Sequence, residues 1–187
     1  MQSNHYDAVI IGFGKGGKTL AAKLAQAGKT VALVEQDPGM YGGTCINVGC
    51  IPSKSLIHSA ALAERTAGRD EREAAYRAAV EEKRRLTAAL RKKNYEKLAA
   101  LPNVTIYDGT ARFTGPLQIE VASGDARRTL TGGKVFINTG SVPRIPPIEG
   151  VGAVEGVYTS AGLMELDALP ERLAVIGGGY IGLEFAS

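Results

Sequence analysis

The sequence predicts an α/β protein in which a parallel sheet is covered by helices and carries an inserted antiparallel meander. Two features predict this class. Apolar runs end in glycine-rich turns that lead into helical sequence, first over residues 6–28 and again over 173–186. Between them, residues 103–140 alternate apolar and polar side chains and place glycine and proline where turns are expected. The 187 residues suffice for one domain and part of a second.

The first unit is a strand, a helix and a second strand. "YDAVIIG" (6–12) is short, apolar and β-branched, which is typical of a buried parallel strand. Small and apolar residues then follow at helical spacing up to Gly28, a typical helix stop. "KTVALVEQD" (29–37) predicts the second strand. A strand–helix–strand unit of about 30 residues has the length of a βαβ motif.

The middle of the chain predicts helices. Pro52 indicates the start of a helix through residues 53–64, because proline is well tolerated in a first turn. The charged, alanine-rich stretch from Glu64 to Leu101 predicts helix, broken near Gly68, and its charged part, Glu64–Lys97, predicts a solvated amphipathic helix pair.

The following region predicts strands. Residues 103–108 favour a strand, 109–133 a small antiparallel meander, and 134–140 a final apolar strand. A proline-rich connection follows, and Leu173–Ile176 predicts one more strand.

Composition limits the possible partners and location. Hydrophobic residues make up 44% and charged residues 22%, as in globular proteins with a core. The net charge is only +3 and no polybasic arm is present, so nucleic acid is not an expected partner. No run of about 18 apolar residues predicts a membrane span. The N-terminus lacks a secretory pattern, so we expect a cytoplasmic location, where lasting structural disulfides are rare.

The first glycine cluster matches G-x-G-x-x-G at Gly12, Gly14 and Gly17. In a Rossmann-like fold these glycines permit a tight turn, close approach to a pyrophosphate, and close packing of helix on strand. The cluster follows a strand and opens a helix, and Glu35 ends the next strand, where a ribose hydroxyl acceptor is expected. The alternatives are a glycine turn without a ligand and a solvated acid at the strand end.

A second cluster places Gly177, Gly179 and Gly182 at the same spacing. Two dinucleotide fingerprints in one chain indicate two dinucleotides and electron transfer between them. The chain reaches Ser187, short of the position about 20 residues on that distinguishes NAD from NADP.

Cys45 and Cys50 are the only cysteines, and both lie in "GGTCINVGCIPSK" (42–54). The candidates are a structural disulfide, a metal clip, buried inert thiols and a working redox pair. A helix beginning near Pro52 and the ammonium of Lys54 both favour a reactive thiolate. A metal is less favoured because only His5 and His58 are available as further histidine ligands.

The same segment resembles the active-site signature of the class I pyridine nucleotide–disulfide oxidoreductases, which include dihydrolipoamide dehydrogenase, glutathione reductase and mercuric reductase. "VIIGFGKGG", "VALVE", "DGTARF", "INTGSVP" and "GGGYIGLEFAS" resemble other segments of that family, in the same order. "GFGKGGKTLA" and "MYGGTCIN" are similar to the branch that defends bacteria against reactive chlorine and hypothiocyanous acid.

The resemblance implies catalytic roles for four residues, Cys45, Cys50, Lys54 and Glu184, and a cofactor-binding role for Tyr180. Cys45 would be the interchange thiol that meets the substrate, and Cys50 would face the flavin and form a charge-transfer pair with it. Lys54, paired with Glu184, would lie near the flavin N5, and Tyr180 would gate the nicotinamide pocket. The alternatives from the residues alone are that Glu184 is an exposed helix acid and that Tyr180 is a packing ring.

The resemblance also implies the cofactors FAD and either NAD or NADP. The implied cofactor-binding residues, besides the two glycine fingerprints, Glu35, Lys54 and Tyr180, are Gly43, Thr44, Ala111, Thr139 and Gly140. We expect residues 1–150 to form the FAD-binding domain, 151–170 a linker, and 171–187 the first strand, turn and helix of an NAD(P)-binding domain.

These expectations define an FAD-dependent reductase that serves cell redox homeostasis. Its substrate would be a small-molecule or protein disulfide, an oxidant or a metal ion, and the full-length parent would be a homodimer. Family members continue well past this length, so we expect the chain to be an incomplete and inactive N-terminal part. The alternatives are a nucleotide-binding module without turnover and a cysteine-pair protein that binds a metal or oxidant.

Overall fold

The computed structural model describes residues 4–63 and 68–186. They form two compact units, one made of Met1–Asn47 with Ala89–Ser141 and the other of Val48–Ala88 with Val142–Ser187. The domain boundaries predicted near residues 150 and 170 remain predictions.

A four-stranded parallel sheet forms the centre of the first unit, with the strand order β4-β3-β2-β8. Its strands are β2 (Ala8–Ile11), β3 (Val31–Glu35), β4 (Val104–Asp108) and β8 (Val135–Ile137). Successive side chains of a strand point to opposite faces, and here both faces are covered, which is why β2 and β3 are apolar at nearly every position. The predicted α/β class and parallel sheet are confirmed.

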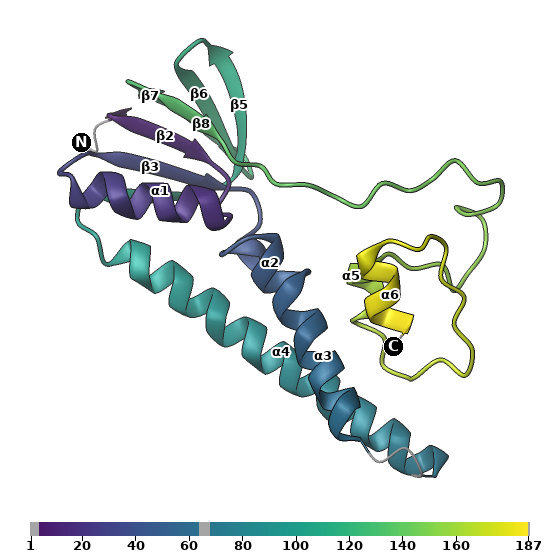
Figure 1. Ribbon diagram of the computed structural model, residues 1–187. Helices are drawn as coiled ribbons and strands as arrows, with labels where there is room; N and C mark the ends of the chain where they lie inside the picture. The colour runs from purple at the N-terminus through teal and green to yellow at the C-terminus, as the bar shows by residue number, and fades with distance from the viewer. Residues whose placement is uncertain (1–3, 64–67, 187) are drawn as a thin grey trace. The chain divides into compact units, whose positions relative to one another are not determined.

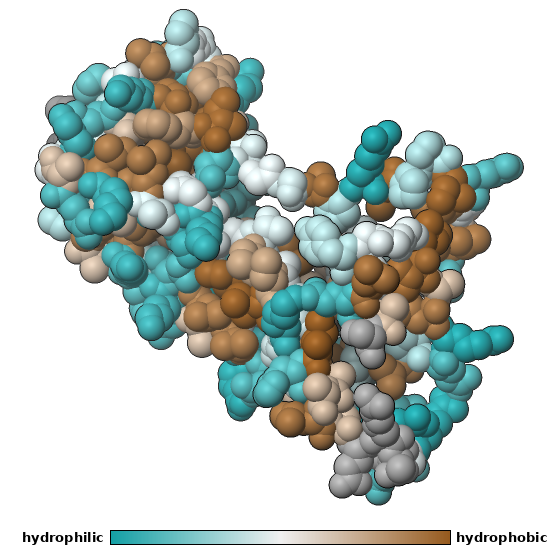
Figure 2. Space-filling model, viewed as in Figure 1, coloured by the Kyte–Doolittle hydropathy of each residue, from teal (hydrophilic) through white to brown (hydrophobic). Residues whose placement is uncertain are grey.

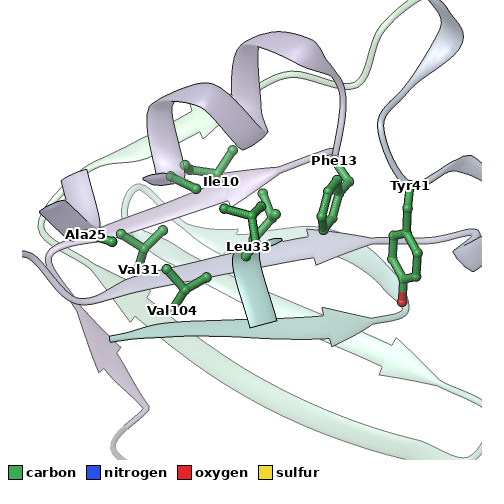
Figure 3. Packing of buried hydrophobic residues seen from close by; sticks show 9 residues of the cluster. Ile10, Phe13, Ala25, Val31, Leu33, Tyr41 and Val104 are labelled. Atoms are coloured by element: carbon green, nitrogen blue, oxygen red, sulfur yellow. The ribbon is translucent and has the colours of Figure 1, made fainter. Parts of the chain in front are cut away.

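Helix α1 (Lys15–Gln26) covers one face of this sheet (Figure 1). Ile10 and Leu33 are fully buried on this face, where Ala21 of α1 packs against them. Figure 3 shows side chains from β2, β3 and β4 lying side by side on the α1 side of the sheet. Gly28 follows the helix with φ +76°, as its predicted role as a helix stop requires.

The antiparallel meander covers the opposite face (Figure 1). It consists of β5 (Thr110–Gly115), β6 (Gln118–Ser123) and β7 (Ala126–Gly132). Val9 and Ala32 of the parallel sheet pack against Ile119 and Leu130 of the meander, so the two faces of β2 and β3 serve two separate cores. The predicted meander over residues 109–133 is confirmed.

The predicted first strand is divided in two. β1 (His5–Tyr6) pairs with β7 of the meander, whereas β2 belongs to the parallel sheet. Asp7 lies between them, and its carboxylate accepts hydrogen bonds from the backbone N–H of Thr30 at 2.8 Å and from its hydroxyl at 3.0 Å. These bonds hold the chain where it passes from one sheet to the other.

Two short helical segments lead to a longer helix: η1 (Pro38–Met40), α2 (Thr44–Asn47) and then α3 (Cys50–Leu62). The prediction placed the start of α3 at Pro52, but the helix begins at Cys50. Pro52 lies within its first turn, where a missing N–H removes no intrahelical hydrogen bond.

Helix α4 (Arg69–Ala99) is continuous over 31 residues, so the predicted helix pair is wrong within this range. Its sequence contains neither glycine nor proline and is rich in alanine, glutamate, lysine and arginine, which favour helix throughout. The predicted break at Gly68 does coincide with the start of α4, and residues 64–67 lie outside the described residues.

The second unit also contains α5 (Ser160–Leu163) and α6 (Tyr180–Ala186). The predicted strand at Leu173–Ile176 is absent from the described structure: no neighbouring strand supplies hydrogen bonds there, and Ile176 is 72% exposed. Figure 2 shows hydrophobic patches among hydrophilic ones on the visible surface. No described helix is long and apolar enough to cross a membrane.

Candidate functional site

The carboxyl ends of the parallel strands meet at one edge of the sheet. The backbone N–H of Gly12, after β2, donates to Val34 O of β3 at 2.7 Å. The N–H of Asn138, after β8, donates to Ile11 O at 2.8 Å, and that of Gly109, after β4, donates to Glu35 O at 2.8 Å. In open α/β sheets, ligands bind outside this edge.

The first fingerprint forms a strand-to-helix turn at this edge. Gly12 has φ +104°, and a β-carbon there would lie 2.2 Å from Asn138 O. A β-carbon on Gly17 would lie 2.4 Å from Gly12 O, so only glycine allows this approach of helix to turn. Gly14 is the N-cap of α1 and makes no side-chain capping bond, which leaves first-turn N–H groups available to an anion.

Asn138 holds this turn together, although sequence reasoning missed it. Its Nδ2 donates to Gly12 O at 3.0 Å. β-carbons on Gly14 and Gly16 would lie 3.0 Å from Nδ2 and 2.8 Å from Oδ1 of the same side chain. The only signal in the sequence was its position directly before the predicted Thr139-Gly140 segment.

Glu35 is buried at the end of β3, with 9% of its surface exposed. Its Oε2 accepts from the backbone N–H of Phe13 at 2.9 Å, and its Oε1 accepts from that of Asp37 at 3.1 Å. The bond from Phe13 connects the carboxylate to the glycine turn. Each carboxylate oxygen can accept a further hydrogen bond, so the position suits a ribose hydroxyl.

The cysteine segment begins directly on the glycine turn. A β-carbon on Gly43, which has φ +80°, would lie 2.5 Å from the Cα of Gly14 and 3.4 Å from Lys15 N. Gly42 N donates to Phe13 O at 3.2 Å. The two backbones are therefore in contact, and a side chain at Gly43 would separate them.

Asn47 fixes the other end of α2. Its Nδ2 donates to Tyr41 O at 3.1 Å and to Gly43 O at 3.0 Å, and its Oδ1 accepts from Arg91 Nε of α4 at 3.0 Å. At the start of α2, Thr44 lies close to Gly140: a β-carbon placed on Gly140 would be 3.6 Å from Thr44 Oγ1.

Tyr41 packs between the glycine turn and α4. Its ring centroid lies 4.9 Å from that of Phe13, seen beside it in Figure 3, and 4.8 Å from that of Tyr95. Its hydroxyl donates to the carboxylate of Asp108. Burial and this hydrogen bond raise the pKa of Tyr41, so the phenol remains a neutral donor at physiological pH. Sequence reasoning missed both Tyr41 and Asn47, since their contacts come from residues distant in the sequence.

The two cysteines occupy successive helices, and both are thiols in this structure. Cys45 is half-buried in α2 of the first unit, and Cys50 is exposed at the first residue of α3 in the second unit. Within residues 4–63 and 68–186, no group of three or more His, Cys, Asp or Glu residues is arranged to hold a metal ion.

The structure brings Lys54 and Glu184 together within the second unit. The Lys54 ammonium of α3 forms an ion pair with the Glu184 carboxylate of α6, which also accepts from Ser53 Oγ at 3.3 Å. The lysine side chain is 63% exposed and the glutamate 25%. Tyr180, at the start of α6, is 81% exposed.

The second fingerprint has the same local form as the first. Gly177 has φ +103°, and a β-carbon on Gly182 would lie 2.7 Å from Gly177 O and 3.0 Å from a Val175 methyl. The corresponding distances from Gly17 are 2.4 Å to Gly12 O and 3.0 Å to an Ile10 methyl. The turn of the second fingerprint thus forms although no strand directly precedes it in the described structure, whereas β2 precedes the first fingerprint. Nothing lies within 4 Å of the β-carbon position of Gly179.

The other predicted contacts lie near the carboxyl edge. Ala111 of β5 pairs with Val121, two residues after the turn at Gly109 that bonds to Glu35. Thr139 is exposed, and Gly140 has φ +72°. Whether these residues contact a cofactor stays a prediction.

Comparison with known proteins agrees with these features. Residues 6–187 match the family model described as pyridine nucleotide-disulphide oxidoreductase. The chain is 47% identical over 184 residues to the probable pyridine nucleotide-disulfide oxidoreductase RclA of Escherichia coli, with 98% of this chain and 40% of the relative covered. It is 40% identical over 190 residues to mercuric reductase of Streptomyces lividans, with 97% and 40% covered.

Solved structures give the same result. The HOCl-induced flavoprotein disulfide reductase RclA from Escherichia coli matches with a TM-score of 0.87 and 46% identity, covering 97% of this chain and 39% of that one. Its Cu(II) complex matches with a TM-score of 0.88, covering 99% and 40%. The chain thus spans about 40% of the length of these relatives.

Proposed function

The chain belongs to the pyridine nucleotide-disulphide oxidoreductase family, and on that premise we propose that it supplies the FAD site and redox disulfide of an NAD(P)H-dependent reductase. The observation that carries this proposal is the backbone contact between Gly43 and Gly14. It joins the cysteine segment directly to the turn that suits a pyrophosphate.

The residues at the carboxyl edge fit FAD. The first-turn N–H groups of α1 would bind the pyrophosphate, and Glu35 would accept from a ribose hydroxyl. Thr44, Ala111, Thr139 and Gly140 would contact the remainder of the cofactor. Bound FAD would take a hydride from reduced nicotinamide and supply the electron pair that opens a Cys45–Cys50 disulfide. Lys54, with Glu184 as its counter-ion, would supply positive charge that stabilises the reduced cofactor.

The cysteines then perform thiol–disulfide exchange. Two electrons and two protons convert the Cys45–Cys50 disulfide to two thiols. The Cys45 thiolate attacks one sulfur of a substrate disulfide, forms a mixed disulfide and releases the first substrate thiolate. The Cys50 thiolate attacks the Cys45 sulfur, releases the second thiolate and restores the internal disulfide. Both released thiolates take up protons, so the substrate has gained two electrons and two protons.

The wider proposal concerns substrate, partners and location. The similarity to a reductase described as HOCl-induced favours a small-molecule or protein disulfide formed under oxidant stress, or the oxidant itself. The second fingerprint, around Gly177 and Tyr180, would begin the NAD(P)H site. We further propose a cytoplasmic homodimer for the full-length protein, with the domain boundaries near residues 150 and 170.

A visible absorption spectrum tests the FAD site. The full-length protein, mixed with excess FAD and passed through a desalting column, should retain yellow flavin, whereas the 187-residue chain alone should retain little or none. Gly43→Val should lose it, because a branched side chain would meet the Gly14 backbone. Gly152→Ala is the matched control, since nothing lies within 4 Å of its β-carbon position. No flavin on the parent full-length protein, or equal retention by its Gly43→Val variant, contradicts the proposed site.

A further inference from the structure

Lys18 lies on α1, one turn after the glycine turn, and is half-buried. Its ammonium donates a hydrogen bond to the carboxamide oxygen of Asn94 on α4. The Asn94 amide in turn donates to Leu90 O at 2.7 Å, which fixes the orientation of the carboxamide. Ordering the long side chain of Lys18 in this way costs conformational entropy.

The same face of α4 also holds the cysteine segment. Arg91, one turn before Asn94, donates to Asn47 Oδ1 at 3.0 Å. Asn47 is two residues after Cys45 in α2. One face of α4 therefore fixes both Lys18 and the short helix that carries Cys45, while the close approach of Gly43 to the Gly14 backbone joins the start of that helix to the start of α1.

The contacts through Asn94, Arg91 and Asn47 bring Lys18 and the helix that carries Cys45 to the same face of α4, where their charges would interact. Burial lowers the pKa of Lys18, and a negative charge on Cys45 opposes that shift. Lys15 on α1 and Lys97 on α4 also face Lys18, and their like charges lower its pKa further. An attraction between opposite charges favours the ionised form of both partners. The charge on Lys18 therefore favours the thiolate form of Cys45.

We propose that Lys18, held by Asn94, is a positioning residue that stabilises the thiolate of Cys45 for attack on the substrate. This rests on the proposed function, in which Cys45 is the interchange thiol. The thiolate is the nucleophile in thiol–disulfide exchange, so a fixed ammonium nearby increases the reactive fraction at neutral pH. It also attracts anionic substrates to the same thiol.

The pH dependence of Cys45 alkylation tests this proposal without any cofactor. In a Cys50→Ser background, the reduced 187-residue chain is treated with iodoacetamide from pH 5 to 10. Lys18→Met should move the midpoint of the rate profile upward by roughly 1 pH unit, equivalent to about tenfold less thiolate below the midpoint. Lys18→Arg should retain most of the parent profile. Lys23→Met, which removes a charge from the last turn of α1, is the control and should leave the profile unchanged.

A second reagent separates charge from packing. Lys18→Met should lower the rate of anionic iodoacetate relative to neutral iodoacetamide above both midpoints, and high salt should reduce this difference. An unchanged midpoint in Lys18→Met overturns the proposal, as does an equal shift in Lys18→Arg, which would indicate altered packing. Because alkylation needs no flavin or nicotinamide, these results are independent of the proposed reductase activity, which the flavin spectrum tests.

Discussion

Gly43 contacts Gly14 backbone to backbone, so the residue that precedes α2 lies directly on the turn that begins α1. A β-carbon at position 43 would approach the Gly14 Cα to 2.5 Å, and the positive φ of +80° adds strain for any other residue. This contact joins the first glycine fingerprint to the cysteine segment, which are two separate motifs in the sequence. It also ties the position of Cys45 to the geometry of the dinucleotide turn.

Gly43→Ala should therefore destabilise the first unit by roughly 1–3 kcal/mol, from backbone strain and from the forced shift of Gly14. Urea unfolding followed by tyrosine fluorescence measures this change. Gly152→Ala, in an open stretch, should shift stability by less than about 0.5 kcal/mol. Equal stability of the two variants would show that the contact at Gly14 relaxes without cost.

The two cysteines should differ in reactivity and in their effect on the flavin. In the full-length FAD-bound protein, Cys50→Ser should abolish the long-wavelength absorption band that appears on reduction, and Cys45→Ser should retain it. Alkylation of the reduced protein, mapped by mass spectrometry, should modify Cys45 first. Preferential modification of Cys50 would reverse the assigned roles, even though Cys50 is the more exposed thiol in this structure.

Lys83 should stabilise the second unit. Its side chain is 1% exposed, and its ammonium donates to Met164 O at 2.6 Å and pairs with Glu165. Lys83→Met should cost about 1–3 kcal/mol, because it leaves a buried carbonyl without its donor. Hydrogen exchange of the α5 amides should speed up accordingly. Lys92→Met, whose side chain is 77% exposed, is the control, and similar exchange in both variants would rule out the role of Lys83.

Stability should fall between about pH 10 and 12 through Tyr107. Burial raises its pKa to about 12 from the ordinary 10.0, aided by the hydrogen bond with Tyr6 at 2.6 Å and opposed by Arg128. The pKa of Tyr107 is higher in the folded chain than in the unfolded chain, so its contribution to the free energy of unfolding is complete below pH 10. That contribution is lost as the pH rises through 12. Thermal melting across this range should show a smaller decline for Tyr107→Phe. An identical decline would assign the loss to other groups.

NADH or NADPH oxidation by the 187-residue chain with added FAD should be undetectable against a disulfide acceptor. Residues Leu173–Ile176 are not part of a sheet in the described structure, so the second fingerprint lacks the strand that positions such a turn. Full-length protein assayed alongside is the control. Turnover by the short chain close to that of full-length protein would contradict this prediction.

The sequence by itself determined the features that depend on neighbouring residues. The spacing of Gly12, Gly14 and Gly17 encodes a local turn, and the second cluster adopts the same turn even without a paired strand. The apolar runs and turn residues likewise predicted the parallel sheet and the meander, because hydrophobic period and turn chemistry act over a few residues.

Only the tertiary structure decided which distant side chains support these motifs. Asn138, Tyr41 and Asn47 have no signature of their own, since their partners are brought near by the sheet order and by α4. The same reason explains the missing strand at Leu173–Ile176: an apolar run specifies a preference, but a strand exists only when another strand accepts its backbone hydrogen bonds. Lys18 became relevant to Cys45 in the same way, through the packing of α1, α2 and α4 rather than through any local pattern.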